Sequence, residues 1–189
     1  MPAVVRPVTD ERDSLLTFLV QQRQAITIAA HGLTDEQAHM RPTVSAFSVA
    51  GLVSHLTDVE RSWAAAVEQC DFAPASRGGP PELSTPPTLA RLLAEYAEAT
   101  ARTDAVIGAV PDLGSPVPVP PDARWAPREV QEWSVRWVLL HLIQETSRHA
   151  GHADLIRESI DGATALSLMA AVERWPARRT IRPWTPPTG

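Results

Sequence analysis

The chain of 189 residues contains no lysine, only one cysteine and no long apolar run. All 17 basic side chains are therefore arginine, and 22 acidic residues bring the net charge to −5. The charges form no basic stripe, so we expect no nucleic-acid partner. The lone Cys70 cannot form an internal disulfide, and nothing indicates an oxidising compartment. Because neither a signal peptide nor a membrane-length apolar segment is visible, we expect a cytoplasmic protein without membrane contact.

Signals for β-strands are also missing. There is no sustained alternation of apolar and polar residues, and no Asn-Gly or Asp-Gly pair joins two apolar runs. Apolar residues recur instead at helical spacing. The length and the apolar fraction of 44% suit one all-α domain over residues 1–189, with a Pro-rich irregular tail from about residue 176 that is loose at its end.

Capping residues and apolar spacing predict four long helices, a short capped turn beginning at Thr34 and a shorter sixth element. The expected helices cover about 10–32, 48–70, 88–110, 134–160 and 163–173. The segment 111–133 is too rich in proline for a helix, so we expect it to pack across the bundle. Four tryptophans are expected in the core and in a pocket wall: Trp63, Trp125, Trp133 and Trp137. The pattern favours an antiparallel four-helix bundle with at least one long crossover.

Two ionisable residues interrupt the apolar face of the fourth long helix. Glu145 and His149 fall on the same face as Val138, Leu142 and Ile156. A buried carboxylate is costly unless something pairs with it. Because residues four apart lie one turn apart, Glu145 and His149 could bind one metal ion together. An internal ion pair or hydrogen-bonded pair in the core is the alternative.

A third ligand has to come from another helix. His55 lies at the edge of the apolar stripe of the second long helix. The set of His55, Glu145 and His149 suits Zn²⁺ with an open fourth position, and Fe²⁺ or Ni²⁺ is also chemically acceptable. Along the edge of the fourth helix, His141 and His152 could support the ligands, and either could replace Glu145 among them.

Two segments resemble a known family. The stretches SVAGLVSHLTDVERSW (48–63) and WSVRWVLLHLIQETSRHAGHADLIRESIDG (133–162) resemble the DinB-like four-helix bundle superfamily. Within it, the chain is similar to the actinobacterial branch that includes the metal-binding domain of mycothiol-dependent maleylpyruvate isomerase. The resemblance extends over nearly the whole chain, from about residue 6 to residue 165.

The resemblance implies an up-up-down-down bundle with three metal ligands. By this resemblance the ligands are His55, Glu145 and His149, and His152 occupies a position that lines the pocket. Only a short tail follows Gly162, so we expect no appended C-terminal domain of the isomerase type. Maleylpyruvate isomerisation is therefore not expected.

The reaction that this resemblance favours is metal-dependent S-transfer from a small thiol such as mycothiol to a small electrophile. A metal-bound thiol loses its proton readily. His152 is the candidate for moving that proton, and Arg148 and Arg157 could steer an anionic substrate unless they form an ordinary solvated face. Cys70 is expected roughly 20 Å from the metal, too far to bind it.

Two other functions stay open at this point. The chain could be a metal-binding stress-response or sensing protein without catalysis, or a structural bundle whose histidines satisfy one another. A homodimer is plausible for such a bundle, although no apolar stripe identifies its surface.

Overall fold

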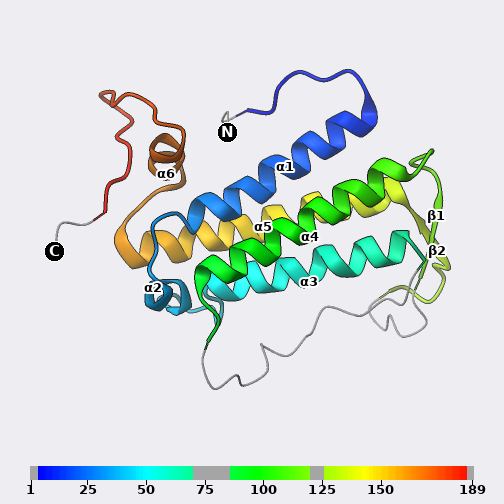
Figure 1. Cartoon of the computed structure of the whole chain (residues 1–189), viewed down its shortest axis with the longest axis horizontal. Coiled ribbons are helices and arrows are strands. Elements are labelled where there is room, and N and C mark those ends of the chain that lie inside the picture. The colour runs from blue at the N-terminus through cyan, green and yellow to red at the C-terminus, as the bar shows by residue number, and fades with distance from the viewer. Residues whose placement is uncertain (1–3, 70–85, 120–125, 187–189) are drawn as a thin grey trace.

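The computed structural model describes residues 4–69, 86–119 and 126–186. Within these ranges the chain forms six helices and one short two-stranded ribbon (Figure 1). The elements in chain order are α1 (Glu11–Ala29), α2 (Asp35–His39), α3 (Val49–Val67), α4 (Leu89–Ala109), β1 (Pro116–Pro118), β2 (Glu132–Ser134), α5 (Val135–Asp161) and α6 (Ala165–Val172). No helix in the described ranges is long and apolar enough to cross a bilayer.

Side-chain caps fix where the long helices begin. The side chains of Asp10, Ser48 and Ser134 each accept a hydrogen bond from a backbone N–H in the first turn of α1, α3 and α5. Such a bond satisfies one of the donors that have no partner within the helix. At the other end of α5, Gly162 adopts a left-handed conformation (φ 75°) that stops the helix. The predicted starts at Ser48 and Ser134 are therefore confirmed.

The four long helices form the predicted all-α bundle, but their order of directions differs from the expected one. One buried cluster joins residues from one end of all four helices: Ile26, Val53, Leu92 and Ile156. A second cluster joins residues from the opposite end: Leu19, Val59, Ile107 and Val138. Helices α1 and α5 thus run one way, and α3 and α4 run the other way (Figure 1).

The order is consequently up-down-down-up, which corrects the expectation of up-up-down-down. The connection from α1 to α3 holds only the short α2, so α3 returns antiparallel to α1. Because α3 and α4 run in the same direction, the predicted long crossover joins these two helices. Helix α5 then packs between α1 and α3, and α4 packs on α3.

A two-stranded ribbon corrects the expectation that strands are absent. Strands β1 and β2 pair antiparallel, with Val117 opposite Trp133 and both side chains buried. Each strand has only three residues, and β1 begins and ends in proline. So short a pairing leaves no alternation in the sequence, which explains why the pattern did not predict it.

The C-terminal tail is irregular, as predicted, and is anchored at Trp184, while its last three residues lie outside the described ranges. The backbone N–H of Trp184 donates a hydrogen bond to the carbonyl of Ser167 in α6. The indole of Trp184 covers Gly32, where an added Cβ would lie 2.5 Å from the ring. The tail therefore crosses back onto the end of α1, against which α6 also packs.

Arg157 is buried beneath this tail and neither steers a substrate nor faces solvent. Its side chain has no exposed surface, pairs with Asp161 at 3.0 Å and donates to the carbonyls of Ala29 and His31. The ring of Trp184 lies 4.8 Å from the guanidinium carbon. Neither role considered for Arg157, steering a substrate or forming a solvated face, fits this place, because the side chain ties α5 to the end of α1.

Candidate metal site

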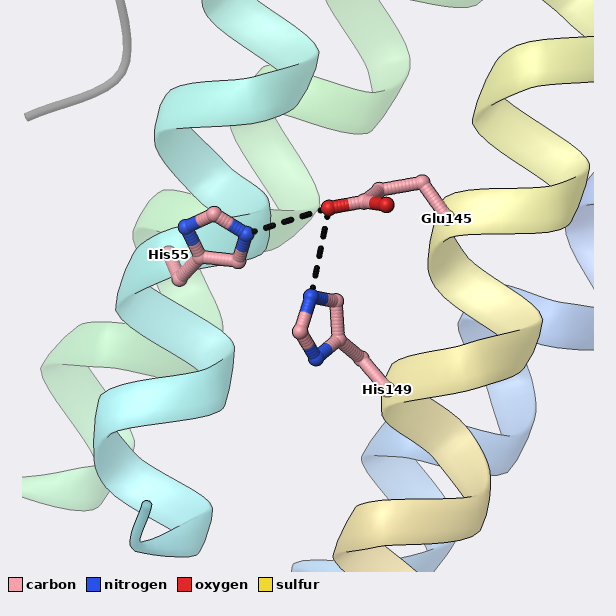
Figure 2. A group of neighbouring side chains, drawn as sticks. All are labelled: His55, Glu145 and His149. Atoms are coloured by element: carbon pink, nitrogen blue, oxygen red, sulfur yellow. Dashed lines mark hydrogen bonds and ion pairs between the residues drawn. The ribbon is translucent and has the colours of Figure 1, made fainter. Parts of the chain in front are cut away.

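The candidate site lies between α3 and α5, whose inward faces carry the three predicted ligands. His55 comes from the middle of α3, and Glu145 and His149 come from successive turns of α5. Figure 2 shows the three side chains pointing toward one another across the gap between the two helices. The structure therefore brings together the three residues that the sequence singled out.

The donor atoms of the three side chains converge on one carboxylate oxygen. His149 Nε2 lies 3.2 Å and His55 Nε2 lies 3.4 Å from Glu145 Oε1 (Figure 2). One ligand atom from each residue lies within 4.8 Å of the other two. The imidazole rings themselves meet edge to face, with centroids 4.8 Å apart.

The two imidazole–carboxylate distances are compatible with a shared metal ion as well as with a hydrogen-bonded pair. A charge-assisted N–H···O bond is about 2.7–2.9 Å long, shorter than either contact here. Two ligands bound at about 2.1 Å to a tetrahedral cation lie about 3.4 Å apart. Two imidazoles and one carboxylate are also a donor set that Zn²⁺, Fe²⁺ and Ni²⁺ accept.

The electrostatics of the site favour an ionised Glu145. Hydrogen bonds from His149 and His55 hold the pKa of this carboxyl well below its ordinary value, although partial burial acts in the opposite direction. At neutral pH the site thus holds one negative charge between two imidazoles. This charge would attract a divalent cation and offset half of its charge.

One side of the site is open to solvent. The side chains of His55, Glu145 and His149 are 33%, 24% and 12% exposed. His149 is the least exposed of the three side chains and therefore lies deepest in the site. A small molecule could therefore reach the three donor atoms from the side of His55 and Glu145.

His152 and Phe47 border the site beyond His149. The ring of Phe47 lies 5.7 Å from the rings of both His149 and His152. The Nδ1 atoms of both histidines are buried and have no hydrogen-bond partner in the described part of the chain. Phe47 precedes α3 and lies outside any helix. The helical spacing of apolar residues therefore could not indicate which side chains it contacts.

On the other flank, His141 belongs to an aromatic cluster. Its ring stacks on Trp137 with an interplanar angle of 7° and meets the edge of Trp63. Burial lowers the pKa of His141, and the Glu145 carboxylate opposes this shift. His141 is therefore a neutral part of the wall rather than one of the three convergent donors, which agrees with the supporting role considered for it.

Of three other residues considered in the sequence, only Arg148 lies within the described ranges. Arg148 is exposed on the surface of α5 one turn from Glu145, and within the described ranges it forms no ion pair. Cys70 and Trp125 fall outside the described residues, so their predicted places stay untested.

Comparisons with known proteins agree with this architecture. Among solved structures, the chain is similar to a conserved protein from Enterococcus faecalis, with a TM-score of 0.63 and 14% sequence identity. The match covers 82% of this chain and 100% of the other, and at this identity it shows the fold alone. The comparison with curated proteins gives no match.

A family model provides the more specific result. The model described as mycothiol S-transferase matches residues 14–162, from the first turn of α1 to the end of α5. This range contains all three convergent donors and covers more than half of the chain. The DinB-like resemblance of segments 48–63 and 133–162 is confirmed, and the chain belongs to the mycothiol S-transferase family, a DinB-like family.

Proposed function

We propose that this protein is a metal-dependent S-transferase that joins a small thiol, mycothiol by family membership, to a small electrophile. The observation that carries the proposal is the convergence of His55, Glu145 and His149 on one point. Family membership supports the reaction class, and the donor set supports the metal dependence. Zinc is the preferred metal, with nickel and iron as chemically acceptable substitutes.

The three ligands would leave part of the metal's coordination sphere free for the substrate thiol. A divalent cation held here would bind the thiol sulfur and lower its pKa, so that the thiolate forms at neutral pH. Glu145 would keep the net charge of the loaded site low, and the two imidazoles would hold its geometry. The open side at His55 and Glu145 would admit the thiol.

The transfer itself requires a proton acceptor and an orienting wall. The thiol proton leaves first, and His152 is our candidate for accepting it because its ring lies 5.8 Å from that of His149. The thiolate sulfur then attacks the electrophilic carbon. A carbon–sulfur bond forms, and the leaving group departs with its electron pair. Phe47 would shield this corner of the site from water.

A thiol-consumption assay tests this function. Metal-loaded protein should accelerate loss of mycothiol in the presence of monobromobimane. His149→Ala should lower kcat/KM at least about 100-fold, because the variant lacks one of the three ligands that hold the metal. His152→Gln should lower kcat while the bound metal stays. His39→Ala is the matched control, since His39 lies on α2 and hydrogen-bonds to the carbonyl of Pro87.

Failure of this assay would have a defined meaning. If the protein binds metal but consumes no thiol with any electrophile, the transferase proposal is wrong. The chain would then fit the alternative of a metal-binding protein without catalysis. Equal activity of native protein and His149→Ala would instead contradict the assignment of the ligands.

A further inference from the structure

A stack of flat rings borders the candidate metal site along α5. The rings of Trp133 and Trp137 lie 4.9 Å apart at an interplanar angle of 14°, and those of Trp137 and His141 lie 5.1 Å apart at 7°. We call these three rings the aromatic stack. Helix α3 closes it from one side, since the ring of Trp63 lies 5.0–5.6 Å from all three rings, edge-on to Trp133 and His141 and tilted to Trp137.

The aromatic stack is continuous with the donor atoms. Trp137, His141, Glu145 and His149 follow one another at intervals of four residues on α5. The step from His141 to Glu145 is therefore one helical turn, about 6 Å along the axis. A molecule lying along the stack would have one end beside the site.

Only part of this aromatic cluster is needed to fill the core. Trp133 and Trp63 are 8% and 4% exposed, as expected for core residues. Trp137 is 37% exposed, and its neighbour Leu140 is 51% exposed. In the rim, the row of α5 beside the stack, the uncharged Leu140 and Gln144 lie between two arginines, Arg136, which pairs with Glu11, and Arg148. Because Trp133 and His141 both stack on Trp137, the exposed part of Trp137 is its ring edge, which can contact the face of a flat, neutral group.

We propose that Trp137 and the adjoining rim bind the electrophile, and that the preferred electrophile carries a flat, uncharged aromatic group. This inference rests on the proposed function, because the rings can orient an electrophile only if the neighbouring donor atoms hold the site of the attacking thiol. Trp137 acts as a specificity residue that places the reacting carbon near the thiol sulfur. With 1-chloro-2,4-dinitrobenzene, the carbon–sulfur bond forms and chloride leaves with its electron pair.

The kinetic test compares two electrophiles of different shape. Trp137→Leu should raise KM for chlorodinitrobenzene about tenfold, equivalent to about 1.4 kcal/mol, the scale of one aromatic contact. The same variant should leave KM for the thiol and kcat/KM for iodoacetamide, which has no ring, within about twofold. Trp137→Phe should restore most of the affinity. Leu155→Ala is the control for an exposed apolar residue of α5 away from the rim, since Leu155 is 61% exposed and lies beyond His149. Equal losses with both electrophiles, or none with either, would overturn the proposal.

An equilibrium test separates this proposal from the proposed function. The probe is 1,3-dinitrobenzene, which lacks a leaving group, and its binding is followed by calorimetry. Native protein should bind it about tenfold more tightly than Trp137→Leu, whether or not the protein consumes thiol. Absence of binding, or equal binding by both proteins, would reject the stack as a binding surface even if S-transfer occurs.

Discussion

At the scale of single residues, the site depends on the shared oxygen of Glu145. Both imidazoles approach this atom at distances longer than those of charge-assisted hydrogen bonds. The three residues could be predicted because each interrupts or borders an apolar helical face. The role of Arg157 could not be predicted from the sequence. Its carbonyl partners lie at the end of α1, far away in the chain, so the residues around Arg157 do not indicate them.

Asp154 provides a pH-dependent prediction at this scale. Burial, with the nearby Glu158 carboxylate as a smaller cause, raises the pKa of Asp154 to about 6. The folded protein therefore binds more protons than the unfolded chain between the ordinary value of 3.8 and about 6. This group's contribution to the free energy of unfolding is full below pH 4 and is lost as the pH rises through 6.

Asp154→Asn should consequently be more stable than the native protein at pH 7.5 and equally stable at pH 4. We expect a gain of about 1 kcal/mol, since solvent screens a half-buried group. Urea unfolding at both pH values, with a chelator present to exclude metal binding, measures the difference. The same difference at both pH values would show that the pKa of Asp154 is not its cause.

At the scale of elements, helix boundaries were predictable and the relations between helices were not. The caps at Ser48 and Ser134 are local signals, and the structure confirms both. The direction of α3 was predicted wrongly, because the expected order came from the family resemblance and not from the short connection that turns α3 antiparallel to α1. The ribbon of β1 and β2 joins residues distant in sequence, so it left no signal either.

The anchored tail gives a prediction for two glycines of similar conformation. Gly32 and Gly162 have φ values of +72° and +75°, but only Gly32 lies against a side chain, that of Trp184. Gly162→Ala should cost about 1 kcal/mol for the left-handed backbone, and Gly32→Ala should cost distinctly more because the tail must move. Urea unfolding measures both costs.

Removal of the ring tests the origin of this difference. In a Trp184→Ala background, the cost of Gly32→Ala should fall to that of Gly162→Ala, because the added methyl group then meets no indole. If the difference persists without the ring, the tail does not pack on Gly32 as the structure shows.

At the scale of the whole molecule, the bundle places one open site between α3 and α5 and secures the far ends of the helices. The first and last long helices run in parallel and are joined through Arg157, and α3 contributes a ligand from the opposite direction. The matched range 14–162 spans the complete four-helix bundle. We therefore expect a bundle that folds without metal and acquires its chemistry when a cation binds.

Elemental analysis of protein purified without an affinity tag tests this account most directly. It compares the native chain, the double variant His55→Ala/His149→Ala and the control His39→Ala after equilibration with Zn²⁺. The account predicts close to one metal ion per chain in the native protein and the control, and almost none in the double variant. No bound metal in the native protein, even after reconstitution with Zn²⁺, Ni²⁺ and Fe²⁺, would contradict it, as would full metal content in the double variant.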